Sequence, residues 1–424
     1  MTTTSRVAVI GAGWAGLAAA VELSDAGIAI DVFEASRTLG GRARAVQWNG
    51  LTIDNGQHIL IGAYSETLRL MRKVGADPDK LLLRMPLRLE FPGEFLLTAP
   101  KLPAPFHTLA ALLTARGIDW REKLSAVRLM LTLQRNNYRI EPDVTVQQWL
   151  DNNQTPSRQR RLLWEPLCIA ALNTPVADAS AQILANVLRD SLGGKREASD
   201  LLLPRVDLSS LFPEPAARFV MEHHGTVRRG QRIGALRREG NCWYADAEGP
   251  YDQVIVAVAP QHASSLLAGD ALQTAEMEWQ PIVTTYLQYP SNFRLPSPMQ
   301  GLAEGTAQWL FDRGQSCGQH GLIAAVISAR GRHLQLATED LEHLIDQEVR
   351  RVAGTDTAPI AVTTITEKRA TFSARPNLQR PSGKLGNGLW LAGDAVAGDY
   401  PATLEGAIRA GVSAAKGISE IRSR

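Results

Sequence analysis

The sequence predicts an α/β protein built around a parallel β-sheet, and three segments support this prediction. The chain opens with an apolar strand, Val7–Ile10, a glycine-rich turn, an alanine-rich helix over Trp14–Asp25 and a second strand over Ile28–Phe33. Two later segments, Asp252–Val258 (DQVIVAV) and Leu389–Asp394 (LWLAGD), are apolar at most positions. Strands of a parallel sheet are buried on both faces and are therefore hydrophobic throughout. We expect the chain to leave the first domain and to return to it twice.

The turn after the first strand has the spacing of a dinucleotide site. Gly11, Gly13 and Gly16 form GxGxxG between a strand and a helix. Such glycines permit the turn, let the backbone approach a pyrophosphate and let helix and strand pack closely, with the helix N-terminus facing the negative charge. Glu34 ends the second strand at about the 20-residue offset expected for an acid that binds a ribose. The adjoining residues of this predicted site are Trp14, Ala15 and Ala35.

A second glycine pair and an arginine follow in the run LGGRAR. Gly40 and Gly41 let the chain lie against a cofactor, and Arg42 can neutralise a pyrophosphate, a feature that NAD sites do not usually carry. Near the C-terminus, Gly393 and Asp394 follow an apolar strand and precede the run YPATLEGA.

These runs, GAGWAG through EASRTLGGRAR and LWLAGDAV, resemble the amine oxidase and phytoene desaturase superfamily of flavoproteins. The resemblance implies a Rossmann-like FAD-binding domain of the GR2-type flavoprotein fold. It also implies that Asp394 meets the ribityl or pyrophosphate portion of FAD, that the following helix N-terminus faces the flavin ring, and that Val227 binds adenine through its backbone. The further FAD-binding residues implied are Gly41, Arg42, Arg44, Gly56, Gln57, His58, Gly393, Thr403 and Leu404.

At 424 residues the chain is too long for one compact core, so we expect two to three domains. Between the nucleotide-binding segments, the pattern predicts helices over residues 108–135 and 144–189, and strands over Thr284–Tyr289, Leu322–Ser328 and Ile360–Glu367. These would form a helical subdomain and a mixed-sheet substrate domain. We therefore assign FAD binding to residues 1–85, 216–275 and 386–424, the helical and substrate-binding region to 86–215, and the mixed sheet to 276–385.

Three residues are candidate proton donors. Asp54–Tyr64 (DNGQHILIGAY) resembles the segment of polyene desaturases that passes the isoalloxazine ring, and it contains His58. Histidine can exchange a proton near neutral pH, although a single histidine is also a common structural residue. Asp399 and Tyr400, beside the predicted flavin face, are the competing donors.

Three middle and late motifs point to one branch of the superfamily. Trp164–Leu167 (WEPL), Ala170–Pro175 (AALNTP) and Glu367–Phe372 (EKRATF) resemble the hydroxysqualene dehydroxylases of hopanoid-producing bacteria. The resemblance implies a reductive dehydroxylation, in which an acid protonates the allylic hydroxyl, water leaves and reduced FAD supplies a hydride. It also implies hydroxysqualene as the substrate and a functional link to the enzymes that make it.

The allylic cation of such a reaction needs a dry channel, because water would capture it. Trp164, Trp309 and Phe311 are candidates to line that channel, and ring faces can stabilise positive charge. A thirty-carbon substrate would reside in a bilayer, so the amphipathic region Thr108–Arg135 is the candidate mouth, although such helices more often cover a core.

Composition excludes several classes. The 45 basic and 43 acidic residues leave no charge excess for nucleic acid, and Cys168, Cys242 and Cys317 have no metal-site or disulfide spacing. No apolar run approaches the roughly 18 to 20 residues of a spanning helix. We predict a reduced, cytoplasmic protein without a metal, and a peripheral contact with the inner face of the membrane stays open.

Two rival functions also stay open. A carotenoid or phytoene-type desaturase would share the fold, FAD and an apolar channel while running the chemistry in the oxidative direction. A lipid-binding escort protein would keep the fold without catalysis, but Glu34, Arg42 and Asp394 are all present.

Overall fold

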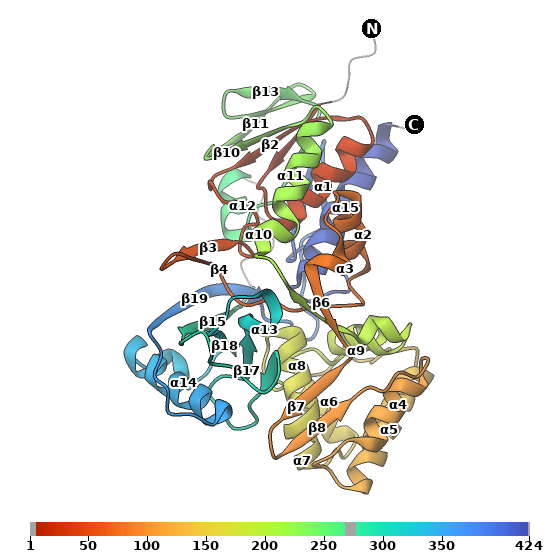
Figure 1. Ribbon diagram of the computed structural model, residues 1–424. Coiled ribbons are helices and arrows are strands. Elements are labelled where there is room, and N and C mark those ends of the chain that lie inside the picture. Colours follow the sequence, from red (N-terminus) through yellow and green to blue (C-terminus); the bar gives the residue numbers. More distant parts are fainter. Residues whose placement is uncertain (1–5, 268–276, 423–424) are drawn as a thin grey trace.

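The computed structural model describes residues 6–267 and 277–422. Figure 1 shows a parallel-sheet part at one end of the molecule, with α1 (Trp14–Asp25) and α15 (Leu404–Arg422) in it, and two lobes at the other end. One lobe contains an antiparallel sheet with α14 (Thr338–Ala353), and the other is mainly helical and contains α4 to α9, within residues 106–192 (Figure 1).

The parallel-sheet part is built on six strands in the order β10-β2-β1-β14-β21-β20. All neighbouring pairs are parallel except β20 with β21, which confirms the predicted α/β class. The strands are β1 (Arg6–Ile10), β2 (Ala29–Glu34), β10 (Thr226–Arg229), β14 (Gln253–Val256), β20 (Lys384–Gly386) and β21 (Leu389–Leu391).

Both faces of this sheet are covered. On β1, Val7 and Val9 pack into one hydrophobic cluster with helical residues, whereas Ala8 and Ile10 pack into another with Tyr251 of a small antiparallel sheet. This is why the strand is apolar at consecutive positions. The covering elements are α1 (Trp14–Asp25), α2 (Ser65–Lys73), α10 (Leu208–Leu211), α11 (Pro213–Glu222), α12 (Pro260–Leu266), α15 (Leu404–Arg422), β11 (Leu236–Glu239), β12 (Cys242–Ala245) and β13 (Glu248–Tyr251).

The second sheet has the strand order β16-β17-β18-β15-β19. We predicted a mixed sheet here, and that detail is wrong, because every neighbouring pair is antiparallel. Hydrophobic patterns indicate which residues are buried but carry little information on strand direction. One face packs against α14 and the other faces the helical part. The elements are β15 (Trp279–Gln288), β16 (Met299–Gly301), β17 (Trp309–Asp312), β18 (Leu322–Ser328), β19 (Ala361–Phe372), α13 (Arg313–Cys317), η3 (Arg332–Gln335) and α14 (Thr338–Ala353).

The helical part begins with two helices over the region predicted as one helical stretch. Gly117 separates them: its φ is +93°, and a Cβ there would lie 1.9 Å from the Glu94 oxygen. Asp119 then caps the second helix through a capping box with Glu122. The elements are β7 (Arg88–Phe91), β8 (Phe95–Thr98), α4 (Phe106–Thr114), α5 (Trp120–Arg135), α6 (Val146–Asn152), α7 (Ser157–Gln159), the π-helix η1 (Arg160–Trp164), α8 (Glu165–Leu172) and α9 (Ala181–Leu192).

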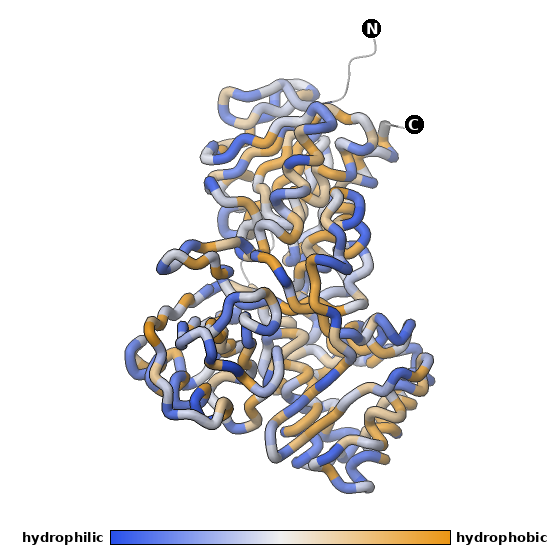
Figure 2. The backbone as a smooth tube through the Cα atoms, viewed as in Figure 1, coloured by the Kyte–Doolittle hydropathy of each residue, from blue (hydrophilic) through white to orange (hydrophobic). Residues whose placement is uncertain are grey.

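Short elements connect the parts. They are β3 (Ala45–Trp48), β4 (Leu51–Asp54), β5 (Leu60–Ile61), β6 (Leu82–Met85), β9 (Leu201–Pro204), α3 (Pro78–Leu81) and η2 (Arg196–Ser199). The described residues contain no helix that is both long enough and apolar enough to cross a membrane. Figure 2 shows hydrophobic residues along the core strands and a mixture of hydrophobic and hydrophilic residues along α4 and α5.

Candidate active site

The glycine-rich turn between β1 and α1 brings three chain segments into close contact. Gly11 has φ +107°, and its N–H donates to the Phe33 carbonyl oxygen at 2.7 Å. A Cβ on Gly11 would lie 2.7 Å from the Ala257 oxygen, and one on Gly16 would lie 2.0 Å from the Gly11 oxygen. These short distances to backbone oxygens exclude any side chain at either position.

The N-terminus of α1 faces a second glycine turn. Gly13 is the N-cap residue, and no side chain caps this helix. Gly13 pairs with Gly40, and a Cβ on Gly41 would lie 3.3 Å from the Gly13 Cα. Side chains at these glycines would fill the space in front of the uncapped helix. An uncapped helix N-terminus beside bare backbone suits a phosphate group, so this cradle fits the pyrophosphate of a dinucleotide.

Glu34 lies at the end of β2 and is fixed by backbone amides. Its Oε2 accepts from the Ala12 N–H at 2.7 Å, and its Oε1 accepts from the Ser36 N–H at 2.8 Å. Each carboxylate oxygen can accept a further hydrogen bond, so the group still suits a ribose hydroxyl. Val227 lies on the neighbouring strand β10, in register with Val32. The predicted neighbour Ala35 is exposed.

Arg42 links the second glycine turn to both the C-terminal segment and the antiparallel sheet. Its Nη2 donates to Asp394 Oδ1 at 2.5 Å, and its Nη1 donates to the Ala370 carbonyl at 2.6 Å. The Arg42 carbonyl in turn accepts from Asn55 Nδ2 at 3.0 Å. Asp394 is buried directly after Gly393, at the end of the parallel sheet. The arginine therefore positions the aspartate next to the nucleotide cradle.

Gly56 and His58 lie where the N-terminal segment meets β15. The His58 Nδ1 atom is 2.7 Å from the Gly56 carbonyl oxygen, and burial lowers the pKa of His58. The imidazole is therefore neutral at pH 7, with Nδ1 as the donor to the carbonyl. A Cβ on Gly56 would lie 3.6 Å from Thr284 Oγ1, a buried hydroxyl that lacks a hydrogen-bond partner within the described part of the chain. An orphaned buried hydroxyl suits a ligand that supplies its partner.

Gln57 belongs to a buried ion-pair network beneath this segment. Arg313 Nη1 donates to Gln57 Oε1 at 2.9 Å and to Asp54 Oδ2 at 3.1 Å. The other Asp54 oxygen accepts from the Leu208 N–H at 2.8 Å. These bonds fix the antiparallel sheet against the segment that carries Gly56 and His58.

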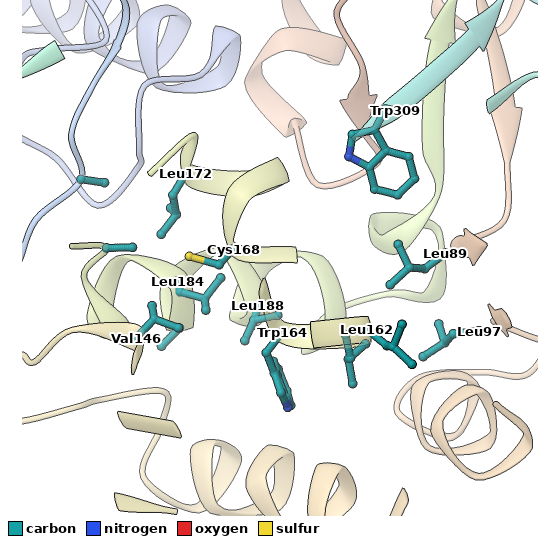
Figure 3. Packing of buried hydrophobic residues seen from close by; sticks show 14 of the residues in the cluster. Leu89, Leu97, Val146, Leu162, Trp164, Cys168, Leu172, Leu184, Leu188 and Trp309 are labelled. Atoms are coloured by element: carbon teal, nitrogen blue, oxygen red, sulfur yellow. The ribbon is translucent and has the colours of Figure 1, made fainter. Parts of the chain in front are cut away.

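An apolar cavity lies between the antiparallel sheet and the helical part. Its lining is mostly leucine, isoleucine, alanine, methionine and tryptophan side chains. Trp164 of η1 and Trp309 of β17 are among the lining residues, and Figure 3 shows both side chains within the surrounding hydrophobic packing. Phe311, the third aromatic residue predicted to line a channel, is buried in the adjacent core and does not line the cavity. Its side chain packs in the same cluster as Trp309.

The cavity becomes polar where α15 begins. Tyr64, Asp190, Tyr400 and Thr403 all line this end. The Tyr400 hydroxyl donates to Asp190 Oδ2, and Thr403 Oγ1 accepts from the Gly406 N–H at 3.0 Å at the first turn of α15. Burial raises the pKa of both tyrosines, so each keeps its phenolic proton at neutral pH.

Of the three predicted proton donors, only Tyr400 lines the cavity as described. His58 does not line it, and the Asp399 side chain is exposed while its carbonyl accepts from Asn186 Nδ2 at 3.1 Å. The remaining predicted cofactor residues lie around the glycine turns and at the start of α15. Trp14 Nε1 donates to the Ala43 carbonyl at 3.0 Å, and Arg44 Nη1 donates to the Gly41 carbonyl at 2.6 Å. Ala15 contacts Gly411 of α15, and Leu404 is the first residue of that helix.

A family model described as flavin-containing amine oxidoreductase matches residues 14–419. The chain belongs to this family. It is therefore a flavin-dependent oxidoreductase, as the two glycine turns and the C-terminal motif predicted. The crystal structure of a protoporphyrinogen oxidase (putative) from Exiguobacterium has the same fold, with a TM-score of 0.71 over 99% of this chain and 100% of that chain at 18% identity.

Relatives within the family are similar over nearly the full length. A hydroxysqualene dehydroxylase from Rhodopseudomonas palustris is 32% identical over 97% of this chain and 98% of its own length. One from Sinorhizobium fredii is 30% identical over 97% of both chains. A probable zeta-carotene desaturase from Synechococcus elongatus is 25% identical over 64% of this chain and 57% of its own length. The branch resemblance given by the middle motifs is thus confirmed.

Three residues of this site were missed from the sequence. Asp190 and Arg313 are charged residues in segments with no motif, and their partners are distant in the chain. Glu405 is different, because it lies directly after the predicted Leu404. It is fully buried and accepts hydrogen bonds from the Thr67 hydroxyl and from Arg409 Nε. A glutamate among the mostly apolar residues at the start of a predicted helix could have been recognised from the sequence as a buried hydrogen-bond acceptor.

Proposed function

We propose that this protein is an FAD-dependent hydroxysqualene dehydroxylase, which converts hydroxysqualene to squalene. The observation that carries the proposal is the mostly apolar cavity that becomes polar at the start of α15, in a chain similar to hydroxysqualene dehydroxylases over nearly its full length. A long hydrocarbon with one hydroxyl group matches such a cavity in its polarity.

The residues around the two glycine turns would hold FAD. Gly11, Gly13 and Gly41 would admit the pyrophosphate, Glu34 would accept from the ribose, and Asp394 would meet the ribityl chain or pyrophosphate. Bound and reduced FAD would supply the hydride for the reaction. The protein would supply the acid, the orientation and the exclusion of water.

The cavity lining suits a cationic intermediate. Protonation of the allylic hydroxyl and loss of water leave a delocalised carbocation, which water would capture. Leu89, Leu97, Leu184 and Leu188 wall the cavity with hydrocarbon (Figure 3), and the faces of Trp164 and Trp309 can stabilise the charge. An apolar wall therefore protects the cation until hydride arrives.

An anionic bilayer is the proposed source of the substrate. Large apolar side chains on and beside α4 and α5 are exposed, including Trp120 at 69% and Phe106 at 59%. The others are Leu102, Leu109, Leu113, Leu124 and Leu131. Basic residues accompany them: Lys101, Arg116, Arg121, Lys123, Arg128 and Arg135. The inner side of α4 lines the cavity through Ala111 and Leu112, so one helix borders both the docking face and the substrate site.

Liposome sedimentation tests this docking face. The double variant Phe106→Ser/Trp120→Ser should lose most of its binding to vesicles that contain phosphatidylglycerol, because both side chains would insert into the interface. Ile360→Ser, which removes an apolar side chain that is 70% exposed beside the antiparallel sheet, should bind like the unmodified protein. Equal binding by all three proteins would refute the docking face and leave the reaction untouched.

The reaction itself is tested by a pair of incubations. Purified protein reduced under anaerobic conditions should convert hydroxysqualene to squalene, and oxidised protein should leave phytoene unchanged. Desaturation of phytoene without conversion of hydroxysqualene would instead identify a carotenoid desaturase. Protein that takes up no flavin when FAD is added would favour an escort protein.

A further inference from the structure

The polar end of the cavity contains an acid that no motif identified. Among the cavity-lining residues in the described ranges 6–267 and 277–422, Asp190 is the single carboxylic acid and no histidine is present. Asp190 lies on the last turn of α9, and its partner Tyr400 lies 210 positions later, just before α15. The pair therefore joins the helical part to the end of the parallel-sheet part.

Asp190 is held in place by two donors. Tyr400 donates its phenolic hydrogen to Oδ2, and Arg189 Nε donates to Oδ1 at 2.8 Å. Tyr400 is fixed in turn: the Arg409 guanidinium stacks 4.4 Å from the ring centre, and Arg380 Nη1 donates to the Tyr400 carbonyl at 2.8 Å. A carboxyl group positioned in this way can meet a substrate hydroxyl with little rearrangement.

The neighbouring acid Glu405 is occupied by the protein itself. Its oxygens accept from the Glu66 and Thr67 N–H groups, from the Thr67 hydroxyl and from Arg409 Nε. It is also fully buried and is not among the lining residues. This leaves Asp190 as the acid that faces the cavity.

We propose that Asp190, oriented by Tyr400, binds the substrate's allylic hydroxyl group and donates the proton that releases it as water. This inference rests on the proposed function and assigns the acid that the reaction requires. Tyr400 is a positioning residue, since its own hydrogen is donated to Asp190.

The Asp190 carboxyl proton passes to the hydroxyl oxygen, the carbon–oxygen bond breaks with its electron pair leaving on water, and an allylic cation and a carboxylate remain. The carboxylate is stabilised by Tyr400 and Arg189 and lies in the same cavity as the cation. Reduced FAD, when bound, would supply the hydride that forms the new carbon–hydrogen bond, and a solvent proton restores the acid.

Single-turnover kinetics with the reduced holoenzyme test the assignment. With hydroxysqualene under anaerobic conditions, Asp190→Asn should slow flavin reoxidation by about 100-fold or more, within the usual range for loss of a general acid. Asp190→Glu should recover part of the rate, and Tyr400→Phe should lose about tenfold, typical of one hydrogen bond to a charged group. Asp151→Asn is the control, because Asp151 is an exposed, arginine-paired aspartate on α6 outside the cavity.

A binding measurement separates recognition of the hydroxyl from the chemistry. The oxidised holoenzyme should bind hydroxysqualene more tightly than squalene, as followed by the change in flavin absorbance. Asp190→Asn should reduce that preference at least about tenfold, whereas Asp151→Asn should preserve it. If the Asp190→Asn variant prefers hydroxysqualene over squalene as strongly as the unmodified enzyme does, the assignment is overturned.

The outcomes separate this inference from the proposed function. If the unmodified enzyme does not convert hydroxysqualene, the proposed function fails. If it does and Asp190→Asn keeps the rate within about threefold, the function stands and Asp190 is not the acid. If Asp190→Asn does not fold, Tyr400→Phe decides: a slower reaction with normal flavin content supports the assignment, and an unchanged rate overturns it.

Discussion

Arg42 and Asp394 lie 352 positions apart in the chain, yet the arginine Nη2 donates to the aspartate Oδ1 at 2.5 Å. The pair closes the parallel-sheet part beside the nucleotide cradle. Asp394→Asn should weaken FAD binding by about tenfold, because the charged partner that orients Arg42 is lost. Titration of flavin-stripped protein with FAD measures this. Asp252→Asn, at the N-terminal end of β14 and so at the opposite end of the strands from Asp394, should bind FAD normally; equal weakening in both variants would contradict a specific role.

A stability prediction concerns Asp54 and Arg313, whose side chains are 2% and 5% exposed. Asp54→Asn leaves the arginine buried without its counter-charge, so unfolding free energy should fall by about 3 to 5 kcal/mol. Denaturant unfolding with tryptophan fluorescence measures it. The matched control is Glu304→Gln, which breaks the exposed pair with Arg161 and should cost less than about 1 kcal/mol. If Asp54→Asn lowers the unfolding free energy as little as the control does, the buried pair does not stabilise the fold.

Helix packing gives a third prediction. A Cβ on Gly411 of α15 would lie 2.1 Å from the Ala15 carbonyl oxygen of α1, so the two helix backbones meet there. Gly411→Ala should lower the unfolding free energy by about 1 to 3 kcal/mol and loosen the adjoining nucleotide cradle. Thermal unfolding checks the loss. Gly234→Ala, where a Cβ would make ordinary contacts with Asp246, should leave the melting temperature nearly unchanged.

Acid sensitivity follows from the partly buried His58. Burial lowers its pKa below the ordinary value of about 6.5, so the unfolded chain takes up a proton at a higher pH than the folded protein. Stability should therefore fall as pH drops through this window and level off below the folded pKa. His58→Gln should reduce the difference in unfolding free energy between about pH 7.5 and about pH 5.5. Part of the pH dependence of the unfolding free energy should remain in this variant, because burial also lowers the pKa values of His107 and His333. Replacing the exposed His262 with Gln should leave the pH dependence unchanged. An unchanged pH dependence in His58→Gln would contradict the prediction.

The sequence predicted the features that depend on local chain geometry. Gly11, Gly16 and Gly41 occupy positions that admit no side chain or need a left-handed backbone; Gly11 directly follows β1, and Gly16 lies in the first turn of α1. Gly16 meets the Gly11 backbone five residues away, and Gly11 and Gly41 have positive φ angles, so part of each requirement is set by the local backbone and is readable as a motif. The apolar strands were also readable, because burial on both faces leaves no polar alternation.

Other features arise only when distant segments meet. Asp190 lies on an amphipathic helix, where an aspartate is most often a solvated surface charge, and its place in the cavity depends on Tyr400. Asp399, adjacent to Tyr400 in the chain, points away from the cavity, so sequence proximity to the flavin motif did not identify the acid. The strand directions of the second sheet likewise follow from chain crossovers, which hydrophobic periodicity does not record.

The most direct test of the account is the stoichiometry of one anaerobic turnover. The flavin of the purified enzyme is fully reduced, excess reductant is removed, and hydroxysqualene is added. Squalene should form in an amount equal to the flavin that becomes oxidised. Squalene formation without flavin oxidation, or flavin oxidation without loss of the hydroxyl group, would contradict it.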